Sequence, residues 1–217
     1  MSGRESAREP GVPGGAHEGT HGAVDHDRGR IGMWLFICTE ILLFGGLFLL
    51  YSVYRYKHPA DFHAASLDLS RFAGTLNTVV LITSSLTAAL AVHELRDGRV
   101  ARSRLFIGAT LLLALAFLTV KGYEWGAKFE HGLYPNAPHL LSLPPGQILY
   151  FGLYFTMTGL HAIHVIVGMG VFGFGLRGMS RGRVTPESPV LVENATLFWH
   201  LVDVIWIFLF PLFYLIT

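Results

Sequence analysis

Residues 31–54 read IGMWLFICTEILLFGGLFLLYSVY, an apolar stretch in which Glu40 is the only acidic or basic side chain. About 20 helical residues, each rising ~1.5 Å, cross the hydrocarbon core of a bilayer, so this stretch predicts a membrane-spanning helix. A carboxylate near the middle of such a helix costs roughly 2.5–3.5 kcal/mol on insertion scales. We therefore expect Glu40 to face other protein or to carry a proton.

The composition of the 217-residue chain agrees with a membrane protein. Hydrophobic residues make up 52% of the chain and charged residues 14%, whereas soluble domains are about 25% charged. The formal net charge of +1 gives no indication of a nucleic-acid partner. The single cysteine, Cys38, cannot form an internal disulfide and says nothing about the redox compartment.

Further apolar segments follow the first, and together they predict an all-α integral membrane bundle of five transmembrane helices. The predicted spans are residues 31–54, 72–93, 103–120, 147–176 and 192–216. They form one domain, residues 29–217, in which the segment 121–146 is expected to be the largest extramembrane element. Residues 1–28 are polar and rich in glycine, and they predict a disordered tail because they cannot bury enough apolar surface to offset ordering.

The arginine and lysine residues indicate how the spans are oriented. Eleven of them fall on the N-terminal side of the predicted membrane and five fall on the opposite side. Loops on the cytoplasmic side carry the excess of positive charge. We therefore expect the N-terminus to be cytoplasmic and, after an odd number of spans, the C-terminus to lie outside.

Polar residues inside the second and fourth spans need partners in the bundle. Asn77, Ser84 and Ser85 in the second span are typical of close helix packing, where small and hydroxylated residues bond across the interface. His161 and His164 in the fourth span are three residues apart and are expected to share a face. They are candidates for metal ligation, for proton transfer, or for structural hydrogen bonding.

The fifth span carries Glu193, His200 and Asp203, which at about 100° per residue fall within one sector of the helix. These groups are expected to face one neighbour, and His200 is expected to pair with Asp203. A metal bound by His161 and His164 would need His200 and Asp203 as its further ligands. By default such intramembrane groups are functional or partnered.

Glu124 and Trp125 follow the third predicted span. Beside Tyr123, they are typical of an interfacial charge within a belt of aromatic residues at the membrane surface. The residues alone therefore predict a helical membrane protein with a buried polar network, and they do not identify a reaction.

Four segments of the chain resemble motifs of the cytochrome c oxidase subunit III family. They are GRIGMWLFICTEILLFGGLF, LNTVVLITSSLTAALAVHEL, TGLHAIHVIVGM and WHLVDVIWIFLF. Glu40 takes the position of the family's buried carboxylate, and Glu193 matches a glutamate just before the closing motif. The segments occur in the family's order from about Gly29 to Thr217. The chain resembles the short bacterial forms, which lack the first two of seven helices.

The resemblance implies a multi-pass subunit of a proton-pumping haem–copper terminal oxidase in the bacterial inner membrane. It implies haem and copper in partner subunits, with no cofactor and no metal in this chain, and it leaves bound phospholipid possible. The implied partners are the catalytic subunit I, subunit II, small subunits and membrane lipids. The implied role is to support proton uptake and the stability of subunit I, with the six acidic and imidazole groups named above as the buried network and no catalytic residue.

Other functions are compatible with parts of this pattern. Within the same class, a quinol oxidase subunit III or an accessory subunit of nitric oxide reductase has similar helices. A proton or solute carrier working alone would use Glu40 and the histidines, but the chain has no inverted repeat or pair of broken helices. A membrane metalloenzyme would use the four candidate ligands, and elemental analysis discriminates it.

Overall fold

The computed structural model describes residues 18–216, with side chains described from Ile31 onward. Within that range the chain is entirely helical apart from its turns, and five of its helices are long and apolar enough to cross a membrane. The helices are α1 (Glu18–Lys57), α2 (Pro59–Ser66), α3 (Arg71–Arg96), α4 (Val100–Glu130), α5 (Pro138–Leu141), α6 (Pro145–Ser180) and α7 (Val190–Tyr214). The predicted all-α bundle with five candidate membrane spans is confirmed.

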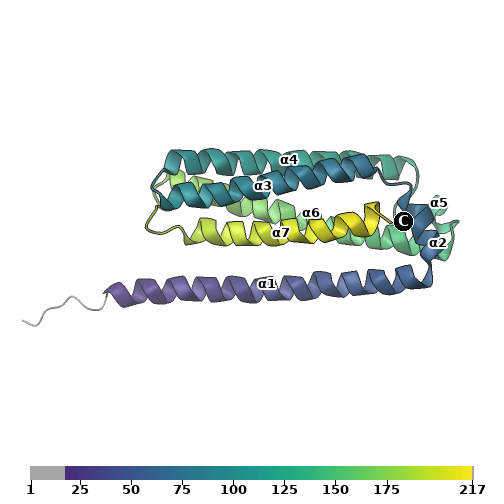
Figure 1. The fold of residues 1–217 in the computed structure, drawn as a ribbon, viewed down its shortest axis with the longest axis horizontal. Coiled ribbons are helices and arrows are strands. Elements are labelled where there is room, and N and C mark those ends of the chain that lie inside the picture. Colours follow the sequence, from purple (N-terminus) through teal and green to yellow (C-terminus); the bar gives the residue numbers. More distant parts are fainter. Residues whose placement is uncertain (1–17, 217) are drawn as a thin grey trace, which may run out of the picture.

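The five long helices run side by side, and α1 lies along one side of the bundle against α6 and α7 (Figure 1). Half of the most apolar stretch of α7 is buried, compared with 11% of the corresponding stretch of α1. Helix α7 is therefore central, since it packs against α1, α3 and α6, whereas α1 is held by one narrow face. The short helices α2 and α5 pack beside α6 at the end of the bundle that holds the C-terminus.

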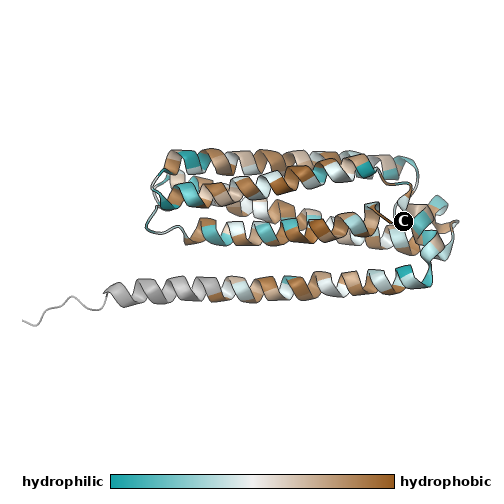
Figure 2. Ribbon diagram, in the orientation of Figure 1, coloured by the Kyte–Doolittle hydropathy of each residue, from teal (hydrophilic) through white to brown (hydrophobic). Residues whose placement is uncertain are grey.

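Hydrophobic residues predominate along the spans, and hydrophilic residues gather in the turns at the ends of the bundle (Figure 2). Large apolar side chains point outward from α1, where Leu35, Leu42 and Leu49 are 64%, 76% and 68% exposed. Such a surface suits contact with lipid chains or with another membrane subunit. The orientation of the bundle relative to the cytoplasm stays a prediction from the arginine distribution.

Two helices extend beyond the predicted spans. The tail was expected to extend to residue 28, but α1 already begins at Glu18; residues 1–17 lie outside the part that the structure describes. The segment 121–146 was expected to lie outside the membrane helices, but α4 continues through its first ten residues to Glu130. The polar side chains of that extension find partners inside the bundle, so the helix does not need to end where the apolar run ends.

Helices α3, α4 and α6 are each followed, two residues after their last residue, by a glycine in the left-handed region, with φ of 77° at Gly98, 65° at Gly132 and 68° at Gly182. After α3, the amide of Arg99 donates to the carbonyl of Glu94 at 2.9 Å across this glycine. This arrangement satisfies carbonyls that the helix end leaves unbonded. It gives α3 and α4 a short connection, which holds them antiparallel.

Candidate functional site: polar contacts between the spans

Glu40 on α1 meets His164 on α6. Its Oε2 lies 2.8 Å from Nε2 of His164, and each side chain is 12% exposed. The other ring nitrogen of His164 lies 2.7 Å from the carbonyl oxygen of Leu160, which orients the ring. The ring edge of Phe44 covers His164 at a centroid distance of 5.4 Å. Glu40 therefore faces protein, and its contact ties the peripheral α1 to the rest of the bundle.

We expect Glu40→Ala to weaken the attachment of α1, at a cost of about 1–2 kcal/mol, since His164 loses its partner in a partly buried site. Proteolysis of α1 in the purified protein measures the effect. Thr39→Ala is the matched control, because Thr39 is exposed and its hydroxyl bonds only to its own helix at Phe36. Equal protease resistance of both variants would show that the pair does not hold α1.

Polar contacts follow the interface between α3 and α7, and we call this set the α3–α7 seam. Nδ1 of His200 lies 2.6 Å from the hydroxyl of Ser85, and the indole of Trp199 donates to Ser84 at 3.0 Å. The Trp206 indole donates to Thr78 at 3.1 Å. Each contact joins a small hydroxyl on α3 to a large ring on α7, so the hydroxyls let the helices approach and also satisfy the rings.

An ion pair completes the α3–α7 seam at the end where α7 begins. Oε1 of Glu193 accepts from Nε and Nη2 of Arg96 at 2.9 and 2.8 Å. The Glu193 side chain is 12% exposed and that of Arg96 is 58% exposed. Glu193 and His200 thus both face α3, but each is bonded to a different residue of that helix.

Asp203 does not pair with His200 as expected. His200 turns to Ser85 instead, because this hydroxyl lies on the facing helix within hydrogen-bond distance. Asp203 is 4% exposed. Its carboxyl lies next to the Ser85 hydroxyl, although neither of its oxygens has a partner at normal hydrogen-bond geometry among the described residues.

His161 and His164 do not share a partner, although they are three residues apart. His164 turns to α1, whereas His161 is 1% exposed and lies against Phe117 and Trp206, with centroid distances of 5.6 and 5.2 Å. Within the described part of the chain, neither ring nitrogen of His161 is hydrogen-bonded, and the same holds for the side-chain amide of the fully buried Asn77.

The four candidate metal ligands do not converge. His164 bonds to Glu40, His200 bonds to Ser85, and His161 lies among aromatic rings. In residues whose side chains the structure describes, His, Cys, Asp and Glu side chains form no group of three or more that could hold a metal ion. His161, His164 and His200 instead contact residues of neighbouring helices.

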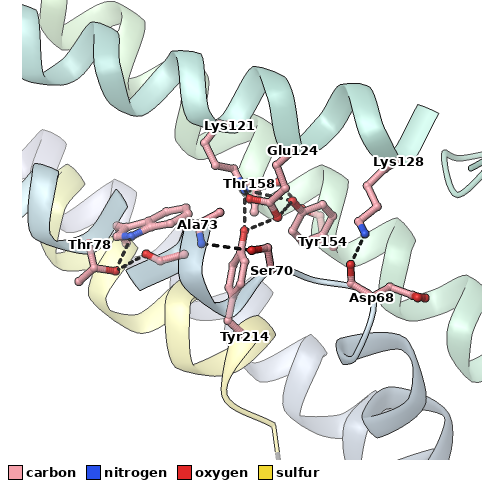
Figure 3. Close-up of polar contacts among 12 residues, drawn as sticks. Asp68, Ser70, Ala73, Thr78, Lys121, Glu124, Lys128, Tyr154, Thr158 and Tyr214 are labelled. Carbon is pink, nitrogen blue, oxygen red and sulfur yellow. Dashed lines mark hydrogen bonds and ion pairs between the residues drawn. The ribbon is translucent and has the colours of Figure 1, made fainter. Parts of the chain in front are cut away.

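A second charged cluster joins α4, α6 and α7, and we call it the Lys121 cluster (Figure 3). Nζ of Lys121 lies 3.3 Å from Oε2 of Glu124 and donates to the hydroxyls of Tyr154 and Tyr214 at 3.0 and 2.8 Å. Both tyrosines donate to Oε1 of Glu124, at 2.7 and 2.6 Å. Lys121 is 5% exposed and Glu124 is 9% exposed, so the charges are paired inside the bundle.

Glu124 is buried in the Lys121 cluster, and its interfacial position stays a prediction. The carboxylate is buried because a lysine one turn earlier and two tyrosines supply its hydrogen bonds, which offsets the cost of leaving water. Trp125 is half-buried and packs on Phe155 with a centroid distance of 5.3 Å. Sequence reasoning missed Lys121, although the spacing of a lysine and an acid at i, i+3 was a usable signal.

Comparison of this chain with known proteins identifies the family to which it belongs. The family model for cytochrome c oxidase subunit III matches residues 11–217. Cytochrome c oxidase subunit 3 of Thermostichus vulcanus is 30% identical over 92% of this chain and 96% of its own length. Cytochrome bo(3) ubiquinol oxidase subunit 3 of Pseudomonas putida is 28% identical over 88% of each chain.

A further relative from Aeropyrum pernix is named haem–copper oxidase subunit I+III. It is 29% identical over 90% of this chain, and the matched part is 24% of its own length. The match to the family model begins at residue 11, before the predicted domain boundary at residue 29, and continues to the last residue. The chain therefore belongs to the cytochrome c oxidase subunit III family, the third subunit of haem–copper oxidases.

Proposed function

We propose that this chain is a non-redox subunit of a cytochrome c oxidase that reduces dioxygen to water, with haem and copper carried by partner subunits. One observation carries the proposal: the imidazole and carboxylate groups of the spans are distributed among contacts between helices. His164 is used by α1 and His200 by α3. Such an arrangement supports a role in assembly rather than in holding a redox centre.

Subunit III proteins associate with subunit I, and the relative from A. pernix is named as a combined subunit I+III. We propose that the chain also contacts subunit II, small subunits and bound phospholipid. The exposed apolar face of α1 supports contact with lipid or protein, since Leu42 there is 76% exposed. Five candidate spans and bacterial relatives make the chain a multi-pass bacterial membrane protein, for which we propose the inner membrane.

The proposed role within the complex is to support proton uptake into subunit I and to keep that subunit stable during turnover. Two half-buried sites could receive protons, namely Glu40 with His164 and Glu193 with His200. The first lies between α1 and α6, and the second lies along the α3–α7 seam. With the predicted orientation, the second lies toward the cytoplasmic end, from which pumped protons are taken.

Purification through a tag on this chain in mild detergent tests the proposal. We expect haem, copper and subunit I to elute with the chain, and we expect the chain separated from them to contain neither cofactor. Oxygen consumption is measured on the same preparation with reduced cytochrome c. A haem or copper ion retained by the isolated chain would contradict the non-redox assignment.

The electron donor has an alternative that one relative favours, because the P. putida protein is a subunit of a ubiquinol oxidase. The two candidate donors are therefore cytochrome c and a quinol. The same preparation supplied with a quinol in place of cytochrome c separates the two. Oxygen consumption with quinol alone would replace the proposed donor and leave the subunit III assignment unchanged.

A further inference from the structure

A groove with charged and polar groups in an otherwise apolar wall opens between α1, α3 and α7, in the half of the bundle where α7 begins. Its volume is about 430 Å³, and its lining includes Trp34 from α1, Ala89 and Arg96 from α3, and Glu193 and His200 from α7. The Arg96–Glu193 ion pair belongs to this wall. The groove therefore brings charged and polar groups together along the flank of the central helix.

The deepest polar contact of the groove leads into the core. His200 lines the groove and is half-buried, and its Nδ1 lies 2.6 Å from the Ser85 hydroxyl. Ser85 in turn lies beside the carboxyl of Asp203. His200, Ser85 and Asp203 thus follow one another from the open groove into the core, where the Asp203 side chain is 4% exposed.

Asp203 is the unusual member of this series. Buried polar groups are nearly always hydrogen-bonded, yet within the described residues neither of its oxygens has a partner at normal geometry. A carboxyl in such a site exchanges its charge for a proton more readily than it remains ionised without a partner. Its burial on the seam is difficult to explain by packing alone, since an apolar side chain would fill the space without this cost.

Beyond Asp203 the core is closed by aromatic rings. Trp206, one turn further along α7, packs edge-on against Phe117 of α4 at a centroid distance of 4.8 Å. Its ring is tilted against that of His161 of α6 at a centroid distance of 5.2 Å. Nζ of Lys121 lies 5.2 Å from the Trp206 ring on the far side. On the other side, His200 lines the groove and leads to Asp203 through Ser85.

We propose that Asp203 is a proton-binding site that exchanges protons with water through the groove, by way of His200 and Ser85. A proton from groove water binds Nε2 of His200, while the Nδ1 proton passes to the Ser85 oxygen. The Ser85 hydroxyl proton passes to a carboxylate oxygen of Asp203. His200 returns to a neutral form with the proton on Nε2, and the net change is one proton moved from water to Asp203.

The charged and titratable groups around this route come from three other helices as well as from α7. Glu193 and His200 belong to α7, Arg96 comes from α3, His161 comes from α6 and Lys121 comes from α4. The proposal rests on the proposed function only in placing the groove mouth at the cytoplasmic side of an oxidase. Proton exchange itself is a property of this chain.

Infrared spectroscopy of the intact complex tests the proposal, with aspartate carboxyl groups labelled with ¹³C. Asp203 is assigned as the labelled protonated-carboxyl band that is absent from Asp203→Asn. The rate at which this band shifts on transfer to D₂O is the readout. We expect exchange to slow about 100-fold in Ser85→Ala, the loss typical of removing a positioned proton-transfer group, and to slow also in Ala89→Trp, which fills the groove.

Thr83→Ala is the matched control, because Thr83 is exposed on the same helix as Ser85 and its hydroxyl donates to the Val79 carbonyl of that helix. If Asp203→Asn does not assemble, the labelled band is assigned from its response to pH in the wild-type complex. Wild-type exchange rates in both Ser85→Ala and Ala89→Trp would overturn the route, and a carboxyl that takes up no proton between pH 5 and pH 9 would overturn the site. Haem content of the same samples reports separately on the proposed function.

Discussion

Glu124→Ala is expected to lower the free energy of unfolding by about 3–5 kcal/mol, because removing one partner of a buried ion pair leaves the other charge uncompensated. Lys121 would keep its two tyrosine hydroxyls but lose the carboxylate at 3.3 Å. Tyr154 and Tyr214 would each lose the acceptor to which they donate. One substitution therefore removes contacts among three helices.

The measurement is a reversible titration with SDS in mixed micelles, together with the amount of this subunit that stays with the complex during purification. Glu130→Ala is the matched control, because Glu130 is an exposed acid near the end of the same helix. The double variant Lys121→Met with Glu124→Leu should recover the part of the loss that comes from the unpaired charge, whereas the hydroxyls of Tyr154 and Tyr214 still lack their acceptor. A Glu124→Ala subunit as stable as the Glu130→Ala control would show that the Lys121 cluster does not stabilise the bundle.

The spans were predictable because hydropathy depends on the total cost of placing side chains in lipid and needs no knowledge of their neighbours. The ends of the spans were not, and α4 shows why. Lys121 and Lys128 read as residues beyond the membrane helix, yet they are 5% and 8% exposed. Lys128 donates to the backbone carbonyl of Asp68, and Lys121 lies in the cluster with Glu124. These partners account for the burial of two lysines that hydropathy alone places outside the bundle.

The polar side chains of the spans were also predictable as a set, but their pairing was not. Spacing within a helix shows which direction a side chain takes, not what it meets. His161 and His164 differ by only three positions, yet one lies against aromatic rings and the other against a carboxylate. His200 and Asp203 have the same spacing, and His200 bonds to Ser85 of the facing helix. Partner choice depends on how the helices cross, which a single sequence does not contain.

The central position of α7 explains why its neighbours carry small residues where they meet it. A Cβ atom at Gly168 of α6 would lie 2.7 Å from the Trp199 ring and 3.2 Å from the Phe198 ring. Trp199 has little freedom to move, because its indole donates to Ser84 at 3.0 Å and its ring packs on Phe172 at 5.6 Å. The close approach of α6 and α7 therefore depends on the missing side chain at this position.

We expect Gly168→Leu to destabilise the bundle by about 3 kcal/mol, the upper part of the range for overpacking a core, because α6 must move away from Trp199 or Trp199 must leave Ser84. Gly170→Leu is the matched control on the same helix, since a Cβ there meets nothing within 4 Å and the residue is exposed. Tryptophan fluorescence and SDS titration measure both variants. Because leucine is a better helix former than glycine, Gly170→Leu should be neutral or slightly stabilising. Equal behaviour of the two variants would mean that the Trp199 contact tolerates displacement and that α7 is held mainly by the α3–α7 seam.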